Sequence, residues 1–447
     1  MLNSEEMSVK IAQKVAHHGG RAYYVGGCVR DRLLKKATKD IDIEVHMIHP
    51  DALRSILSEL GTVNEYGVSF GIFNLSGYDI DIAMPRKEKC TGRGHRDFDI
   101  YVDPFLTPEK AALRRDFTVN ALMMDVLTGE ILDFYGGLKD LEKGVIRHVN
   151  DESFAEDPLR VLRACQFCAR LGFTLHPSTL ELCRSIDIRT LAPERIFGEL
   201  KKALLSAAKP SVFFELLRRM GKLSPWFSEL EDLIGVPQPP KHHPEGDVWT
   251  HTMLVLDKAA SLKDQARQPL YFMVSALCHD LGKPSTTEVV NGALHSFGHE
   301  SAGIPIAKGL LDRISGEKDL ERYVENMILL HMRPNMLLGV ECKPKSFNKL
   351  FDQSLCPDDL ILLSEADFEG RDESFVYGER RDMLLFRLNE FKELMSRPYV
   401  MGRDLIGAGL KPDRNFSKIL DHAHKLRISG VEKEIALKDC IAFAKNL

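Results

Sequence analysis

The chain has 447 residues, a formal net charge of −5, and 44% hydrophobic against 28% charged residues. Its length predicts two to four domains, and its composition excludes an intrinsically disordered chain and a globally basic nucleic-acid binder. The polar start without a signal-peptide core, the lack of 18 consecutive apolar residues and the nine scattered cysteines predict a cytoplasmic protein with no membrane partner.

Short β-rich runs alternate with helical stretches over residues 1–145, which predicts a domain that mixes strands and helices. The runs are AYYVGG (22–27), DIDIEV (40–45), IFNLSG (72–77), YDIDIAM (78–84), TVNALMMDV (118–126) and EILDFY (130–135). In the first run, Gly26 and Gly27 end a strand and precede a helix-like segment that carries Arg30. Paired glycines let backbone N–H groups approach a phosphate, so this turn indicates a phosphate site; an ordinary tight turn is the alternative.

The second run places Asp40 and Asp42 two positions apart. Because side chains alternate across a strand, both carboxylates share one face while Ile41 and Ile43 point into a core. Either this face is solvated and the pair has no function, or a cation lies between the two charges. Beside the glycine turn, the pair predicts a triphosphate site with two Mg²⁺ ions for in-line displacement at phosphorus. Asp81 is a candidate third carboxylate.

A polar, glycine-punctuated segment between Met84 and Leu113 predicts a mobile loop. The sequence RRDFTVNALMMD follows and brings Arg115, Asp116 and Asn120 together before a buried strand. Arginine side chains suit triphosphate oxygens, and an asparagine amide can bond a ribose hydroxyl or a phosphate. The stretch therefore indicates nucleotide binding; the alternative is a helix C-terminus whose arginines complement its dipole.

From about residue 150 strand signals nearly vanish and apolar residues recur at helical spacing. Residues 158–222 hold 12 Lys/Arg against 5 Asp/Glu, so a polyanion could bind there, although solvated helix faces explain the same count. Asp157 and Arg160 lie three positions apart on a helix expected to begin near them. They form either an intrahelical ion pair or a protein template that accepts from an exocyclic amine and donates to a ring nitrogen. Cytosine and adenine share that pattern.

A Pro-rich break at residues 236–247 marks a domain boundary. Beyond it, an adjacent His-Asp pair within CHDLGK is flanked by further histidines at expected helix ends. Neutral imidazoles with carboxylates suit Ni, Mn, Fe or Zn ions, whereas a lone histidine on an apolar helix is ordinarily a core residue. The candidate ligands are His251, His279, Asp280, His299, His331 and Asp367.

Two resemblances follow from these motifs. The first is carried, in order, by GGCVRD (26–31), KDIDI (39–43), RRDFTVNA (114–121), DFYGGLKDL (133–141), EDPLR (156–160) and LAPERIFGEL (191–200). Together they resemble the class II tRNA nucleotidyltransferases, the CCA-adding enzymes, and the similar bacterial poly(A) polymerases, over about residues 1–235. The histidine-rich stretch resembles the HD domains, which are metal-dependent phosphohydrolases, and His299 and His331 resemble the extra ligands of two-metal members.

The first resemblance implies that Asp40 and Asp42 hold catalytic Mg²⁺ and that CTP, ATP and the tRNA 3′ end are the substrates. It also implies that Asp157 and Arg160 select CTP and ATP. The nucleotide-binding residues it implies are Gly26, Gly27, Arg30, Arg115, Asp116, Asn120, Asp157, Arg160 and Arg163.

The implied fold class is α+β, with a head related to polymerase β, an all-α neck and body, and an all-α HD domain. The expected domains are residues 1–145 (head), 146–235 (neck and body), 236–395 (HD domain) and 396–447 (tail). Complete CCA addition, addition of the terminal A alone and poly(A) synthesis share the same motifs. Three further alternatives are an HD phosphohydrolase with a regulatory head, a purely structural HD fold, and a silent RNA-binding protein. The HD activity would be that of a phosphatase or a 2′,3′-cyclic phosphodiesterase.

Overall fold

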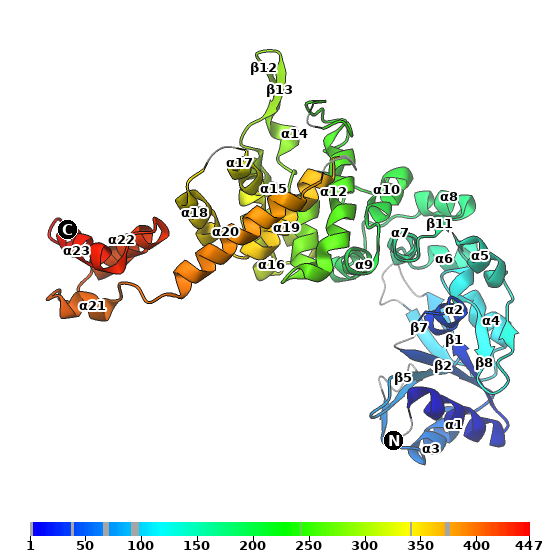
Figure 1. The fold of residues 1–447 in the computed structure, drawn as a ribbon. Coiled ribbons are helices and arrows are strands. Elements are labelled where there is room, and N and C mark those ends of the chain that lie inside the picture. Colours follow the sequence, from blue (N-terminus) through cyan, green and yellow to red (C-terminus); the bar gives the residue numbers. More distant parts are fainter. Residues whose placement is uncertain are drawn as a thin grey trace. The chain divides into compact units, whose positions relative to one another are not determined.

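The computed structural model describes residues 3–36, 40–65, 71–90, 98–241, 243–339, 342–371 and 376–447. Contacts divide the chain into two compact units, one of residues 1–203 with 212–222 and one of residues 204–211 with 223–447 (Figure 1). This division falls within the predicted neck and body, and the bounds of the four predicted domains stay a prediction. None of the described helices is long and apolar enough to cross a membrane.

A seven-stranded sheet forms the head of the first unit, in the order β3-β4-β5-β2-β1-β8-β9. Its strands are β1 (Arg21–Val25), β2 (Ile41–His46), β3 (Val63–Glu65), β4 (Ile72–Leu75), β5 (Ile80–Ala83), β8 (Met123–Asp125) and β9 (Ile131–Leu132). The β2 strand pairs antiparallel with β1 and parallel with β5. Each of the six β-rich runs therefore contains a strand of this sheet.

One of these runs is only partly a strand. Within TVNALMMDV, residues Thr118–Asn120 form a 3₁₀ turn (η1), and the strand begins at Met123. The Thr118 hydroxyl donates to Asp140, and the Asp116 carboxylate accepts from the Phe117 amide. Such side-chain bonds offer the backbone an alternative to a sheet ladder, which explains the difference from the prediction.

The segment predicted as a mobile loop is largely regular structure. Strands β6 (Arg86–Cys90) and β7 (Phe98–Val102) pair antiparallel, and α4 (Pro108–Leu113) follows with Thr107 as its N-cap. Polar, charged residues are compatible with a two-stranded ribbon, because an antiparallel pair can face water, so polarity alone was a poor guide to loop structure. Residues 91–97 of the predicted loop lie outside the described residues.

Helices surround and follow the sheet in the first unit. They are α1 (Ser4–His17), α2 (Gly27–Leu33), α3 (Pro50–Ser58), α5 (Gly137–Lys143), α6 (Asp151–Ala155), α7 (Leu159–Leu171), α8 (Pro177–Ser185), α9 (Pro193–Ser206) and α10 (Ser211–Met220), with a short parallel pair, β10 (Val145–Ile146) and β11 (Thr174–Leu175). Cys165, Cys168 and Cys183 are buried here, and burial raises their thiol pKa values, that of Cys168 to about 12. Although Cys165 and Cys168 have a C-x-x-C spacing, they are packed as apolar core groups.

The second unit is mainly helical. Its elements are α11 (Ser228–Glu231), α12 (Val248–Leu262), η2 (Lys263–Gln265), α13 (Pro269–Cys278), α14 (Lys283–Thr286), β12 (Thr287–Val290), β13 (Ala293–Ser296), α15 (His299–Ile314), α16 (Lys318–Leu330), α17 (Arg333–Leu338), α18 (Pro344–Gln353), α19 (Pro357–Glu369), α20 (Gly378–Ser396), α21 (Gly402–Gly407), α22 (Phe416–Ile428) and α23 (Lys433–Ala444). The α12 helix packs against α13 and α19, and α16 packs against α13 and α15. The last three helices have a small core of their own around Leu405, Ala436 and Cys440.

The expectation of an all-α HD domain is wrong in one element. Strands β12 and β13 form an antiparallel hairpin that projects beyond the helices (Figure 1). Its turn residues, Asn291 and Gly292, have φ values of 53° and 78°. Asn-Gly with positive φ at both positions is the turn that matches the twist of a two-stranded ribbon, so the sequence VVNGAL carried this signal.

Candidate active sites

Three carboxylates lie at the ends of neighbouring strands in the head. The parallel register of β2 and β5 sets Asp42 directly beside Asp81, and Asp40 immediately precedes β2. Burial raises the pKa of Asp42, the charges of Asp81 and Asp40 raise it further, and Arg115 opposes them. A cluster whose own charges repel is a suitable divalent-cation site, so these residues fit the Mg²⁺ ions predicted from the sequence.

The glycine turn lies against this cluster. Gly26 has a φ of 67°, and a Cβ atom there would lie 3.5 Å from Nη1 of Arg115 and 3.8 Å from Oδ2 of Asp42. A Cβ atom on Gly27 would lie 3.3 Å from Nη2 of Arg30. Glycine at these positions therefore keeps the backbone free of side-chain atoms where the carboxylates and arginines gather.

The sequence analysis missed Glu44, which lies on the same face of β2 as Asp42 and is 1% exposed. Its Oε2 lies 3.3 Å from Nη2 of Arg115 and 3.5 Å from Nη2 of Arg114, and its Oε1 lies 3.0 Å from Nε2 of His46. Burial alone would raise the pKa of Glu44, but the His46 hydrogen bond and the two arginines lower it to about 2. The two-residue spacing from Asp42 was the available signal.

Arg30 and Asn120 lie together but inside the protein. Arg30 is 2% exposed, donates from Nη1 to Asn120 Oδ1 at 2.6 Å and from Nε to Asp31 at 2.8 Å, and packs over the Phe167 ring. In this structure Arg30 holds Asn120 in place and does not face solvent. The phosphate contact expected for Arg30 stays a prediction.

Asp116 also makes its contacts inside the protein. Its carboxylate accepts from Asn120 Nδ2 at 3.0 Å and from Nε and Nη2 of Arg163 at 2.8 and 2.6 Å. Although burial would raise its pKa, Arg163 and Asn120 lower it. With both oxygens occupied, Asp116 positions Asn120 and Arg163. Arg163 in turn lies 3.9 Å from Glu199 of α9.

The intrahelical ion pair, one of the two alternatives for Asp157 and Arg160, does not form. The helix begins at Leu159, so Asp157 precedes it and accepts instead from the Leu159 amide. Arg195 of α9 reaches both oxygens of Asp157, at 2.9 and 3.2 Å. Arg160 donates to the carbonyls of Ser153 and Arg114, the latter at 2.8 Å. Each side chain is thus held by its own partners, as a rigid template requires.

In the second unit, the six predicted metal ligands lie at or near the ends of helices. His251 and Asp367 lie within α12 and α19, His279 and His331 cap the C-termini of α13 and α16, Asp280 follows His279, and His299 begins α15. All six are buried. Their ligand atoms form two groups with metal-ligand spacing, His251–His279–Asp367 and Asp280–His299–His331.

Asp280 joins the two groups. Its Oδ2 lies 3.2 Å from Nε2 of His279, and its Oδ1 lies 3.4 Å from Nε2 of His299. Both oxygens are buried and accept no well-aligned hydrogen bond from the described residues, although Nζ of Lys283 is 2.6 Å from Oδ2. Burial would raise the pKa of Asp280, but His279 and Lys283 keep it well below the usual range. Asp280 and the neighbouring imidazoles would hold divalent metal ions, which would supply Lewis-acid chemistry.

The ring orientations support this arrangement. Nδ1 of His279, His299 and His331 donates to the carbonyl three residues earlier, at 2.8, 2.8 and 2.7 Å. These bonds leave Nε2 of each ring on the side of the ligand cluster, 3.2 to 3.8 Å from an oxygen of Asp280. Outer hydrogen bonds of this kind fix the tautomer that binds a metal.

Both units resemble parts of known proteins. Family models match residues 22–147 (Poly A polymerase head domain), 172–234 (Probable RNA and SrmB- binding site of polymerase A) and 248–367 (HD domain). The chain is 38% identical over 366 residues to the multifunctional CCA protein of Pasteurella multocida (strain Pm70), covering 78% of this chain and 84% of that protein. It is 33% identical over 430 residues to the Nitrosococcus oceani (strain ATCC 19707) protein of the same name, covering 92% and 98%.

The chain belongs to the family of multifunctional CCA proteins. Its fold is that of the Bacillus stearothermophilus CCA-adding enzyme solved in complex with CTP, with a TM-score of 0.68, 21% identity and full coverage of both chains. The family assignment confirms both resemblances and the α+β fold class. The head cluster lies within the polymerase-head match, and the six histidine and aspartate ligands lie within the HD match.

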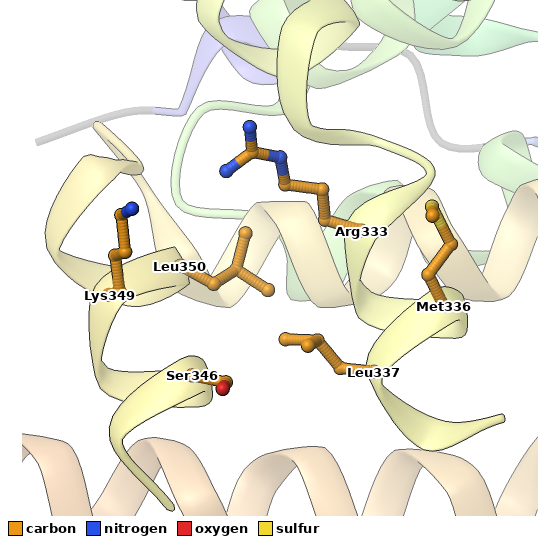
Figure 2. A pocket seen from close by; sticks show the side chains of 6 residues that line it. All are labelled: Arg333, Met336, Leu337, Ser346, Lys349 and Leu350. Carbon is orange, nitrogen blue, oxygen red and sulfur yellow. The ribbon is translucent and has the colours of Figure 1, made fainter. Parts of the chain in front are cut away.

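The described part of the HD-containing unit also has a surface hollow away from the ligand cluster. It lies between α17 and α18, has a volume of about 290 Å³, and is lined by Arg333, Met336, Leu337, Ser346, Lys349 and Leu350 (Figure 2). Arginine, lysine and serine side chains line it beside Met336, Leu337 and Leu350 in this view. None of the predicted site residues lines it.

Proposed function

We propose that this protein adds C, C and A to the 3′ end of tRNA from CTP and ATP, without a nucleic-acid template. The observation that carries the proposal is the gathering of Asp40, Asp42 and Asp81 beside Gly26 and Arg115. The relatives are named multifunctional CCA proteins, and the fold is that of a CCA-adding enzyme solved in complex with CTP, which supports the proposal. Complete addition is favoured over poly(A) synthesis because the relatives are named as CCA proteins.

The residues of the head site would have separate roles in nucleotide addition. Asp40 and Asp42 would hold two Mg²⁺ ions, which when bound lower the barrier for attack of the tRNA 3′ hydroxyl on the α-phosphorus and for loss of pyrophosphate. Arg115, which is partly exposed and close to Gly26, would bind triphosphate oxygens. Asn120 would bond a ribose hydroxyl or a phosphate from the position that Arg30 and Asp116 give it.

Asp157 and Arg160 would read the base. The carboxylate of Asp157 accepts from the exocyclic amine of cytosine or adenine, and Arg160 donates to the adjacent ring nitrogen. Uracil and guanine reverse this donor–acceptor order, so both side chains would be mispaired. The contact from Arg195 supports this role because it restrains the Asp157 carboxylate.

The HD unit supports a second activity. Its ligand set suits Ni, Mn, Fe or Zn, and such ions would activate water for attack on a phosphate ester. Lys283, held 2.6 Å from Asp280, would add positive charge for the phosphate group. We therefore include phosphatase or 2′,3′-cyclic phosphodiesterase activity at damaged tRNA ends in the proposed function. Hydrolysis of 2′,3′-cyclic AMP with Ni²⁺ tests it, and Asp280→Asn should abolish the reaction.

Extension of tRNA at nucleotide resolution tests the main activity. Substrates would end before CCA, after C and after CC, each with Mg²⁺, single nucleoside triphosphates, and CTP plus ATP. Extension of all three that stops at CCA is the expected result. Addition of a single A to the CC-ended tRNA alone would make the protein an A-adding enzyme, and long A tails would make it a poly(A) polymerase.

A further inference from the structure

The Pro-rich segment at residues 236–247, which reads as a linker in the sequence, folds over the histidine–aspartate centre of its own unit. Gln238 is 5% exposed and accepts from Nζ of Lys283 at 2.7 Å. Glu245 contacts two histidines through the same oxygen, Oε1, which lies 2.9 Å from Nδ1 of His243 and 2.7 Å from Nδ1 of His251. The Glu245 side chain is 2% exposed.

The four histidine ligands differ in what holds their Nδ1 atoms. In His279, His299 and His331 a backbone carbonyl three residues earlier accepts the Nδ1 proton. His251 lies in the first turn of α12, where carbonyls are used for bonds along the helix. Its Nδ1 lies 2.7 Å from Oε1 of Glu245 instead, a charge contact that is not aligned as a hydrogen bond in this structure.

A metal bound through Nε2 requires the proton of a neutral imidazole to be on Nδ1. In this structure Nε2 of His251 donates to Oδ1 of Asp367 at 3.1 Å and lies 3.4 Å from Nε2 of His279, within the first ligand group. A metal bound at Nε2 would displace that proton and leave the ring proton on Nδ1. Glu245 is therefore the acceptor that matches the metal-binding tautomer of His251.

His243, Glu245 and His251 also have the spacing of a metal site of their own. Binding there through Nδ1 of His251, together with binding through its Nε2, would require one imidazole to lose both ring protons. If His243 and His251 each direct an Nδ1 proton to Glu245, the short Nδ1–Oε1 distances are explained, and His251 need not lose both ring protons.

We propose that Glu245 is a positioning residue of the HD site, supplied by the Pro-rich segment, that fixes the Nδ1 proton of His251 and directs Nε2 to the metal. The inference rests on the proposed metal site. It makes residues 236–247 a structural part of the HD site as well as a connection between domains. Outer partners of this kind affect metal affinity by about 10- to 100-fold.

Calorimetric titration of the metal-stripped full-length protein with Ni²⁺, in excess Mg²⁺ to occupy the head, tests the proposal. Glu245→Leu, which removes the acceptor at similar volume, should weaken Ni²⁺ binding about 10- to 100-fold and leave nucleotide addition to tRNA unchanged. Glu245→Gln keeps an acceptor oxygen and should recover most of the affinity. Glu288→Leu, at an exposed position of β12, is the matched control.

The outcomes separate the two hypotheses. If the unaltered protein binds no Ni²⁺, the proposed metal site is wrong. If it binds Ni²⁺ and Glu245→Leu binds it within about threefold of the same affinity, or Glu245→Gln is as impaired as Glu245→Leu, the positioning role alone is wrong. Should Glu245→Leu fail to fold, Glu245→Asp decides, because a carboxylate one methylene shorter should lose contact with His251 and weaken binding about tenfold.

Discussion

Glu44 and Arg115 form a half-buried ion pair at the edge of the nucleotide site, with Oε2 of Glu44 3.3 Å from Nη2 of Arg115. The pair restrains a guanidinium whose Nη1 atom lies near Gly26, where the triphosphate is expected. The Glu44 carboxylate thus fixes the position of the Arg115 guanidinium beside the expected triphosphate site.

Glu44→Gln should raise KM for CTP and ATP about tenfold with a smaller change in kcat. A charged hydrogen bond contributes about 1.5–3 kcal/mol, and part of that contribution is transmitted as nucleotide binding. Steady-state kinetics on CC-ended tRNA measure the effect. Glu59→Gln, which removes an exposed pair with Lys14, is the control and should change neither constant. An unchanged KM in Glu44→Gln would assign the pair to folding alone.

The same carboxylate predicts an acid dependence of stability. Its pKa is lowered in the folded protein to about 2 from an ordinary 4.5. A lowered carboxyl pKa contributes stability that is fully present above about pH 4.5 and is lost as the pH falls toward 2. The stability difference between the unaltered protein and Glu44→Gln should therefore shrink by about 1 kcal/mol between pH 6 and pH 3.5. Urea unfolding at both pH values measures it; a constant difference would contradict the lowered pKa.

Asp42→Asn should reduce nucleotide addition about a thousandfold, the effect of losing several kcal/mol of metal-based transition-state stabilisation. Ni²⁺ binding by the HD unit should be unchanged, because none of its ligands lies in the head. Primer extension and calorimetry on the same preparation make the comparison. Equal loss of both properties would argue against two independent sites.

Asp157→Ala should relax the choice of C and A over U and G by about 10- to 100-fold, because a mispaired buried polar group costs about 1–3 kcal/mol. Arg195→Ala leaves the carboxylate in place but unrestrained, so it should relax selection less. Misincorporation of each single nucleotide on CC-ended tRNA measures both. The control is Arg189→Ala, which removes an exposed pair with Asp187. If Asp157→Ala still chose C and A over U and G as the unaltered protein does, Asp157 would not act as a template for the base.

Site residues that follow a strand or helix periodicity were predictable from the sequence. Contacts between residues that are distant in the sequence were not. The alternation in β2 predicted the shared face of Asp40 and Asp42, and the same alternation, extended by one step, would have found Glu44. The Arg195 contact to Asp157 spans 38 residues, and periodicity within one helix carries no information about it. Glu245 was hidden because prolines and glycines around it indicate a linker, although its oxygen contacts two histidines.

Metal binding should stabilise the HD unit measurably. At the proposed site Ni²⁺ would bind the folded ligand set and not an unfolded chain, so Ni²⁺ at a hundred times its Kd should add about 2.7 kcal/mol to the free energy of unfolding. Asp280 lies between the two ligand groups, so Asp280→Asn should remove most of this stabilisation while nucleotide addition persists. Asp312→Asn, at an exposed pair with Lys318, should retain it in full. Urea unfolding with and without Ni²⁺ measures all three proteins. Equal stabilisation of Asp280→Asn and the unaltered protein would place the metal elsewhere, since a carboxylate shared by two ligand groups cannot be lost without weakening both.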